Sequence, residues 1–199
     1  MSIVTLVSGG IDSSVMALLA KKEGIIQYPL FIDYGQRARE KELCACRDIH
    51  AAHDLPKPVV ITLSGFGEII SSGLTDKNKD IFADSFLPGR NLLFLLAGAA
   101  YAYQVHASAV SIGLLNEEIH LFPDQTAQFL TQAEAMLSLC MERNIRVITP
   151  LMKFYKSDVI GLAKKYRLTG TYSCHSGLDE PCGVCVSCKE ILSAQRKEE

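Results

Sequence analysis

The sequence predicts an α/β protein with a five-stranded, doubly wound parallel sheet that helices cover on both faces. Short runs of β-branched and other apolar residues alternate along the chain with longer segments of helical periodicity, which is the pattern of consecutive strand–helix units. The strand candidates are apolar throughout instead of alternating with polar residues, as expected of strands buried on both faces. A cysteine-rich stretch at residues 174–188 predicts a small C-terminal zinc-binding tail.

Each strand and helix is placed by its apolar pattern and by the turn residues around it. The strands are expected at residues 3–7, 26–32, 59–63, 109–114 and 146–149. The helices are expected at residues 12–22, 36–53, 90–105, 123–143 and 156–166. The first helix has an apolar stripe, ends in two lysines that complement its dipole and stops before Gly24, which is typical of an amphipathic helix.

The composition is that of an ordinary globular protein of 199 residues, long enough for one domain and a small appendage. A net charge of −2 gives no general basic field, so we expect no nucleic-acid partner. Residues 92–105 are apolar but too few and too rich in alanine to span a membrane. We therefore expect an α/β domain at residues 1–170, a tail at residues 171–199, and no membrane contact.

The cysteine content and the first residues of the sequence indicate the cellular compartment of the protein. We find no secretory signal, because Met1 and Ser2 run directly into the first predicted strand. Seven cysteines without such a signal favour a reducing compartment, where metal binding or catalysis explains them better than disulfides do. We expect the protein to be cytoplasmic.

The most informative segment is the turn from the first strand into the first helix, which reads SGGIDS at residues 8–13. At the N-terminus of a helix, free backbone N–H groups and the positive end of the helix dipole attract anions. Glycine lets the backbone approach an anion closely and adopt a positive φ. An ordinary strand–helix turn is the alternative, but Ser8, Asp12 and Ser13 favour a polyphosphate site.

Two further residues are expected near this turn. Asp33 follows the second predicted strand, and Gly113 lies near the end of the fourth. The carboxyl ends of parallel strands share one edge of a sheet, and ligands bind outside that edge. We expect Ser8, Asp33 and Gly113 to line one cleft.

Four cysteines have the spacing of a metal site: Cys174, Cys182, Cys185 and Cys188. Four soft thiolate ligands at such short spacing suit tetrahedral Zn²⁺, and a site closed by four protein ligands is structural. An iron–sulfur cluster, a set of disulfides and ligation by His175 are the alternatives. The remaining cysteines lie on predicted helices at spacings unsuited to one metal, namely Cys44, Cys46 and Cys140.

The connection at residues 64–89 is unusually long for a compact domain. It contains glycines and charges but few apolar repeats. We interpret it as a lid or a dimer contact, with a simple surface excursion as the alternative.

Taken together, the motifs resemble those of one enzyme family. The first turn is similar to the Ser-Gly-Gly-x-Asp-Ser loop of the ATP pyrophosphatase superfamily, whose fold is Rossmann-like, of the adenine nucleotide alpha hydrolase type. FIDYGQR at residues 31–37, PGRN at residues 88–91 and PLM at residues 150–152 follow in order, and the cysteines come last. This combination resembles the 7-cyano-7-deazaguanine synthase family over almost the whole chain.

The resemblance implies an ATP-dependent carbon–nitrogen ligase of queuosine biosynthesis. Such an enzyme adenylates the carboxylate of 7-carboxy-7-deazaguanine with release of pyrophosphate, and uses ammonia to form an amide and then the nitrile. The resemblance implies ATP, Mg²⁺ and Zn²⁺ as cofactors and a small-molecule deazaguanine carboxylate as the substrate. It also implies a homodimer.

The resemblance assigns nucleotide contacts to individual residues. The loop for the pyrophosphate consists of Ser8, Gly9, Gly10, Asp12 and Ser13. Further nucleotide contacts are expected from Asp33, Tyr34 and Gly113. For Asp33, a turn residue at the end of a strand is the alternative.

The expected catalytic residues are Asp12, Arg37, Arg90 and Lys156. Lys156 begins a predicted helix at a place where family members use a lysine near the phosphates. Arg37 and Arg90 offer forked donors that clamp anions. The alternatives are a surface arginine for Arg37 and a salt-bridged loop residue for Arg90.

The chain departs from the family in the segment that contacts the deazaguanine. Family members usually carry Asp-Tyr/Phe-Ser-Gly-Tyr-Pro-Asp-Cys-Arg there, whereas this chain has EIHLFPDQT at residues 118–126. Glu118, Phe122 and Asp124 are the candidate substrate-binding residues, because an acid pairs with the N–H donors of a guanine-like base. Solvated acids at a helix start are the alternative for Glu118 and Asp124.

Two single positions also depart from the family. Ala38 stands where the family has a histidine, and His175 stands where it has an aromatic residue.

The departures leave three hypotheses about the function of the chain. The first is the nitrile synthase, and the second is a paralogue that adenylates the same or a related carboxylate and transfers it to another amine, including one on a protein partner. The third is a non-catalytic module that binds ATP.

Overall fold

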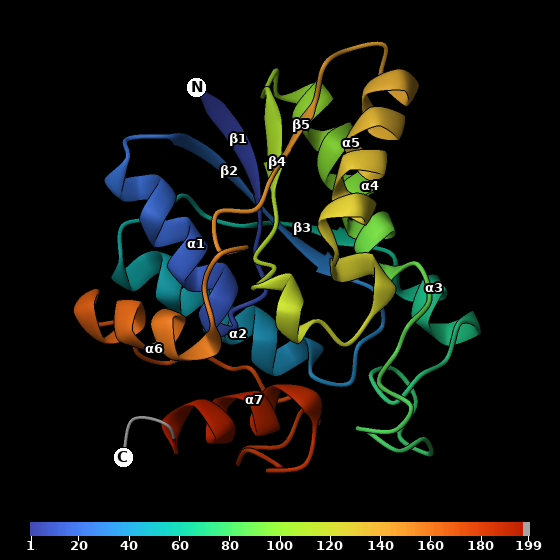
Figure 1. Ribbon diagram of the computed structural model, residues 1–199, viewed down its shortest axis with the longest axis vertical. Helices are drawn as coiled ribbons and strands as arrows, with labels where there is room; N and C mark the ends of the chain where they lie inside the picture. Colours follow the sequence, from blue (N-terminus) through green and yellow to red (C-terminus); the bar gives the residue numbers. More distant parts are fainter. Residues whose placement is uncertain (197–199) are drawn as a thin grey trace.

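The computed structural model describes residues 1–196 and contains one parallel sheet of five strands in the order β3-β2-β1-β4-β5 (Figure 1). The strands are β1 (Ser2–Leu6), β2 (Ile26–Asp33), β3 (Val59–Thr62), β4 (Ala109–Ser111) and β5 (Arg146–Ile148). The chain winds outward from the central strand β1 first in one direction and then in the other, as in doubly wound proteins. The predicted fold class is confirmed.

The helices are α1 (Ile11–Lys22), α2 (Arg39–Ala52), α3 (Ser64–Ile69), α4 (Arg90–Gln104), α5 (Ala127–Cys140), α6 (Lys156–Lys165) and α7 (Val186–Gln195). Two 3-10 helices span Glu117–Ile119 and Pro123–Gln125. Within residues 1–196, no helix has both the length and the apolar character needed to cross a membrane.

Helices cover both faces of the sheet (Figure 1). Leu95 of α4 and Leu137 of α5 belong to the same buried cluster as Val4 of β1. Leu43 of α2 packs with Phe31 of β2 in a separate cluster. Val4 pairs with Tyr28 in the sheet register, so Phe31, an odd number of residues further on, points to the opposite face. The core is therefore split between two layers, as the continuous apolar strands predict.

Several predicted elements have different bounds in the structure. The helix expected at residues 123–143 is divided, because the Thr126 hydroxyl accepts a hydrogen bond from Phe129 N (3.2 Å) and starts α5 after the preceding 3-10 helix. The helix expected from residue 36 begins at Arg39, because the Gln36 side chain accepts a hydrogen bond from Tyr34 N (2.9 Å) and closes a turn. Helices α3 and α7 are not among the predicted ones.

The long connection at residues 64–89 is folded and partly built into the core. It begins with α3, and both Leu74 and Leu87 are 2% exposed. Asp80 Oδ1 accepts hydrogen bonds from Phe82 N (2.8 Å) and Ala83 N (2.6 Å), which hold the following turn. Two apolar anchors and its own turns therefore fix this segment.

The cysteine-rich tail lies against the turn between β1 and α1. Tyr172 N donates a hydrogen bond to Gly9 O (2.9 Å), and Ile11 N donates one to Ser173 Oγ (3.2 Å). Helix α7 packs against α6. The tail is thus joined to the end of the sheet at which the predicted polyphosphate site lies.

Candidate active site

The turn between β1 and α1 has the shape of an anion site. Gly9 has a φ of +80°, and a Cβ there would lie 2.4 Å from Glu42 O, so a side chain does not fit. Ser8 N donates a hydrogen bond to Ser13 Oγ (3.1 Å), and Gly10 N donates one to Ser8 Oγ (3.3 Å). Gly10 is the N-cap of α1 and has no side chain to cap the first turn, which leaves backbone N–H groups there for an anion.

Lys156 joins this turn to the tail. Its Nζ lies 2.9 Å and 2.7 Å from the two carboxylate oxygens of Asp12, and 3.3 Å from Oε2 of Glu190 on α7. Burial lowers the pKa of Lys156, but the two carboxylates outweigh that effect and raise the pKa above its ordinary value. A charged ammonium, 5% exposed as a residue, is therefore held beside the anion site.

Glu190 is a residue that the sequence analysis does not identify. Burial raises its pKa, and the charge of Lys156 opposes that rise. Together with Asp12 it places two carboxylates around one ammonium. A glutamate on a short helix after a cysteine has no local pattern that signals such a contact, because its partner lies on another helix.

A cavity of about 220 Å³ lies at the carboxyl edge of the sheet. The predicted site residues that line it are Ser8, Gly10, Asp12, Ser13, Tyr34, Arg90 and Gly113. Apolar side chains from the strand ends, including Ile32 and Leu114, line it as well. The cavity thus combines an anion site with the apolar surface that a nucleotide base requires. Gly9 is not part of this lining, and its backbone packs closely against the backbone of α2.

Glu42 and His175, which were not predicted as site residues, are among the other residues that line this cavity. Glu42 of α2 accepts a hydrogen bond from Gln36 Nε2 (3.0 Å), and burial raises the pKa of Glu42 to about 7 against the opposing charge of Arg90. His175 lies after the first cysteine of the tail, and its Nδ1 is buried with no hydrogen-bond partner among residues 1–196. Burial lowers the pKa of His175 to about 4, and the charges of Arg90 and Lys156 add to this effect.

The structure places Arg37 and Asp33 outside the lining of this cavity. Arg37 donates a hydrogen bond from an Nη atom to Gly73 O (3.1 Å), in the long connection. Asp33 Oδ2 lies 2.7 Å from Nε of Arg39, so these two residues form an ion pair at the corner between β2 and α2. The expected cleft therefore holds Ser8 and Gly113 but not Asp33.

The candidate substrate residues Glu118, Phe122 and Asp124 do not line the cavity either. Glu118 accepts a hydrogen bond from the Tyr155 hydroxyl (2.5 Å). Phe122 packs on Phe86, with ring centroids 5.2 Å apart. Asp124 accepts a hydrogen bond from Asn91 N (3.3 Å) and thereby holds the first turn of α4, where Arg90 lies.

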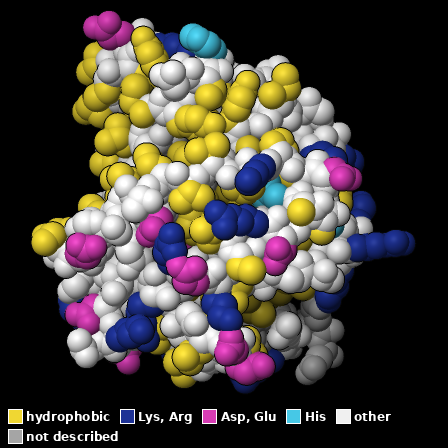
Figure 2. Space-filling view, turned by 180° about the vertical axis from the view of Figure 1, so that it is seen from behind, with side chains coloured by type: hydrophobic (Ala, Val, Ile, Leu, Met, Phe, Trp, Pro, Cys, Tyr) yellow, Lys and Arg dark blue, Asp and Glu magenta, His cyan; other side chains and the backbone are white. Residues whose placement is uncertain are grey.

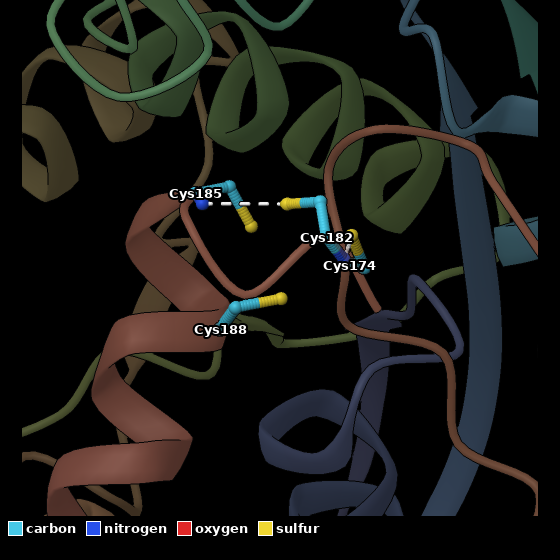
Figure 3. Close-up of side chains that lie close together, drawn as sticks. All are labelled: Cys174, Cys182, Cys185 and Cys188. Carbon is cyan, nitrogen blue, oxygen red and sulfur yellow. Dashed lines mark hydrogen bonds between the residues drawn. The ribbon is translucent and has the colours of Figure 1, made fainter. Parts of the chain in front are cut away.

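The four predicted cysteine ligands converge on one point (Figure 3). The sulfur atoms of Cys174, Cys182, Cys185 and Cys188 all lie within 4.8 Å of one another. Backbone N–H groups of the same loop point at them, since Cys182 N donates to Cys174 Sγ (3.3 Å) and Cys185 N donates to Cys182 Sγ (3.4 Å). Burial raises the pKa of Cys174, but hydrogen bonds from Cys182 and Ser176 outweigh it and lower the pKa to about 6. This donor set fits a metal ion that prefers thiolates.

Comparison with known sequences gives one consistent result. The family model of the queuosine biosynthesis protein QueC matches residues 2–198. A 7-cyano-7-deazaguanine synthase of Nautilia profundicola is 36% identical over 98% of this chain and 93% of its own length. One of Nitratiruptor sp. is 35% identical over 99% of this chain and 94% of its own length.

Comparison with solved structures supports the fold. An NMN synthetase from Francisella tularensis aligns with a TM-score of 0.57 at 16% identity, covering 100% of this chain and 84% of that one. A U34-tRNA thiolase from Methanococcus maripaludis, solved with its [4Fe-4S] cluster, aligns with a TM-score of 0.55 at 16% identity, covering 100% of this chain and 65% of that one. At such low identity the likeness concerns the arrangement of strands and helices alone.

Proposed function

The chain belongs to the 7-cyano-7-deazaguanine synthase family of queuosine biosynthesis, and we propose how its own residues carry that activity. The enzyme is an ATP-dependent ligase that acts on a small deazaguanine carboxylate. The observation that carries the proposal is the glycine-containing turn at the start of α1, which lines the cavity together with Asp12, and the ion pair that Asp12 forms with Lys156.

The reaction needs two activations of an oxygen. A carboxylate oxygen of 7-carboxy-7-deazaguanine attacks the α-phosphorus of ATP, and pyrophosphate leaves. Ammonia then displaces AMP from the acyl adenylate and gives the amide. The amide oxygen attacks the α-phosphorus of a second ATP and pyrophosphate leaves again, and loss of AMP and of both protons of the amide nitrogen gives the nitrile.

The residues of the first turn are suited to the leaving pyrophosphate. Ser8, Gly10 and Ser13 line the cavity at the N-terminus of α1, where negative charge is stabilised. Lys156 adds a full positive charge to the same place. The turn and Lys156 interact most strongly with the phosphates as these depart. Both therefore stabilise the transition state more than the bound substrates.

Asp12 is the residue that we propose for Mg²⁺. Its carboxylate is part of the cavity lining, and oxygen ligands are those that Mg²⁺ prefers. Bound Mg²⁺ would neutralise charge on the phosphates. Asp12 also holds the Lys156 ammonium in position through both of its oxygens.

Arg90 is proposed as a second cation of the site. It is the first residue of α4, lines the cavity and lies over the Phe94 ring at 5.9 Å from the ring centroid. Asp124 would act indirectly, by holding the turn that carries Arg90.

The remaining predicted residues are proposed to have structural roles. Arg37 and Asp33 would fix the corner between β2 and α2. Glu118 and Phe122 would hold the segment of the two 3-10 helices in place.

We propose Zn²⁺ as the metal of the four cysteines. A closed set of four thiolates leaves no open position for catalysis, so the ion would be structural. Its effect on the reaction would come from ordering the tail, because the tail supplies Glu190 to Lys156 and Ser173 to the first turn of α1.

A homodimer is proposed on the basis of an apolar surface. Leu92, Leu96 and Tyr103 are 43%, 45% and 52% exposed on one side of α4, and Met136 and Leu139 are 57% and 73% exposed on α5. Figure 2 shows hydrophobic side chains gathered on the side of the molecule that carries these two helices. Contiguous apolar surface of this kind is typical of subunit contacts.

The activity is tested with the purified protein, ATP, ammonium and 7-carboxy-7-deazaguanine. We expect the nitrile by mass spectrometry, with AMP and pyrophosphate released together. The Asp12→Asn variant should release no pyrophosphate, whereas Asp48→Asn, a change at an exposed position of α2, should keep the activity. Product that stops at the amide, or adenylation without any nitrile, would contradict the proposal.

A further inference from the structure

Four side chains from separate parts of the chain meet in the cavity described above. Tyr34 follows β2, Glu42 lies on α2, Arg90 begins α4, and His175 belongs to the tail. Glu42, Tyr34 and Arg90 line the same cavity, and the charge of Arg90 lowers the pKa of both Glu42 and Tyr34 against burial that raises each. A carboxyl group and a guanidinium therefore face the same cavity.

The carboxyl of Glu42 has capacity to accept further hydrogen bonds. Its side-chain hydrogen-bond partner is Gln36, which donates from Nε2 to Oε2 at 3.0 Å. A carboxylate accepts up to about four hydrogen bonds through its two oxygens. The part of Glu42 that stays accessible lines the cavity, so a ligand in the cavity can reach it.

Glu42 offers two acceptor oxygens and Arg90 offers N–H donors to a ligand in this cavity. A guanine-type ring shows the complementary edge, with O6 as an acceptor and N1–H and the 2-amino group as donors. We propose that Glu42 accepts the N1–H and 2-amino groups of 7-carboxy-7-deazaguanine while Arg90 donates to its O6. This inference rests on the proposed function, and it makes Glu42 the residue that selects the base.

Other bases fit this pair less well. Adenine shows a donor and an acceptor side by side, so its N1 lone pair would face a carboxylate oxygen and repel it. A guanine-type base without the 2-amino group would leave one oxygen of Glu42 without its donor in a partly buried place, which costs binding free energy. The pair thus discriminates at two positions of the ring.

The acids that the sequence analysis singled out are less suited to this task. Glu118 already accepts from Tyr155, and Asp124 accepts from Asn91 N. Neither lines the cavity that holds the anion loop. Glu42 lines it together with Ser8 and Asp12.

The proposed contact also orients the substrate. The carboxylate to be activated is attached to the five-membered ring, away from N1 and the 2-amino group. With that edge held by Glu42, the carboxylate extends into the remainder of the cavity, which the residues of the anion loop line. His175 supplies a further polar group for the base or the carboxylate, because its Nδ1 has no partner among residues 1–196.

The test compares two ligands in wild type and in Glu42→Gln. The ligands are 7-carboxy-7-deazaguanine and the analogue that lacks only the 2-amino group, and their dissociation constants are measured by calorimetry. Wild type should bind the analogue about 10-fold to 100-fold more weakly than the substrate. Glu42→Gln should bind the substrate about as weakly as wild type binds the analogue, and should distinguish the two ligands by a much smaller factor.

A matched control and a second variant test whether the effect on binding is specific to position 42 and depends on its charge. Glu40→Gln makes the same chemical change on an exposed position of the same helix and should bind both ligands as wild type does. The dissociation constant of ATP should be unchanged in Glu42→Gln, which also reports on folding of the cavity. Glu42→Asp keeps the charge and should retain part of the discrimination.

The outcomes separate this inference from the proposed function. Equal discrimination between the two ligands in wild type and Glu42→Gln overturns the role of Glu42, even when wild type makes the nitrile. A loss of ATP affinity with substrate affinity unchanged overturns it too, since Glu42 would then face the nucleotide. Wild type that binds the deazaguanine ligands as described but forms no nitrile would instead overturn the proposed function.

Discussion

The ammonium of Lys156 lies 2.7 Å and 2.9 Å from the two carboxylate oxygens of Asp12, although 144 residues separate them in the chain. Asp12 belongs to the turn that begins α1, and Lys156 begins α6. The helix starts are thereby tied together at the carboxyl edge of the sheet. The pairing fixes the ammonium of Lys156 beside the anion loop, and Glu190 holds the same ammonium from α7.

Replacing Lys156 by methionine should reduce the rate of pyrophosphate release about 100-fold to 1000-fold, because the leaving phosphates lose a full positive charge. The rate is measured by a coupled pyrophosphate assay at saturating ATP. Lys165→Met, near the exposed end of the same helix, is the control and should retain the wild-type rate. An unchanged rate in Lys156→Met would exclude this lysine from the reaction.

Removing the metal should loosen the tail before it unfolds the sheet. Cys188→Ser loses one of four thiolates, so we expect it to carry little zinc and to be cut by protease beyond Tyr172. Cys140→Ser changes an exposed cysteine of α5 outside the cluster and should keep about one zinc ion per chain. Metal content is measured by mass spectrometry. Iron with the visible absorption of a cluster, in place of zinc, would contradict the assignment.

The stability of the protein should depend on pH through Glu42. Burial raises the pKa of Glu42 to about 7 in the folded protein, above the value of about 4.3 in an unfolded chain. Between these values the folded state holds a proton that the unfolded state has released, so rising pH destabilises wild type over this window. The Tm of Glu42→Gln minus that of wild type should therefore increase between about pH 5 and about pH 8. A constant difference would show that the carboxyl is not so perturbed.

A charge placed on the apolar face of α4 should dissociate the proposed dimer. Leu96→Glu puts a carboxylate among the exposed apolar residues of α4, and an interface does not accommodate an unpaired buried charge. Molar mass is measured by light scattering after size exclusion. Leu192→Glu, which changes an equally exposed leucine on α7, should leave the molar mass as in wild type. A wild-type protein that is monomeric at high concentration would contradict the proposal.

The parts of the fold that depend on neighbours in sequence could be predicted well. The turn at residues 8–13 is such a case, since the hydrogen bonds among Ser8, Gly10 and Ser13 span at most five residues. The cysteine cluster is another, because the four ligands lie within one short segment. Continuous apolar strands and the intervening helices likewise led to the sheet that is found.

Contacts between distant segments could not be predicted in this way. Arg37 and Arg39 are two residues apart, and only the packed structure decides that Arg39 turns to Asp33 while Arg37 turns to Gly73. Glu42 lines a cavity that Arg90, on another helix, lines as well. The same holds for Glu190, whose partner Lys156 begins α6.

Glu190 gives the site a dependence on the order of synthesis. The anion loop and Lys156 are synthesised first, and α7, which begins at Val186 and carries Glu190, is synthesised after them. Until then, one of the two carboxylates around Lys156 is missing. A nascent chain with a finished sheet therefore still lacks part of the surroundings of its lysine, and these are completed only when residues 186–195 have been translated and folded.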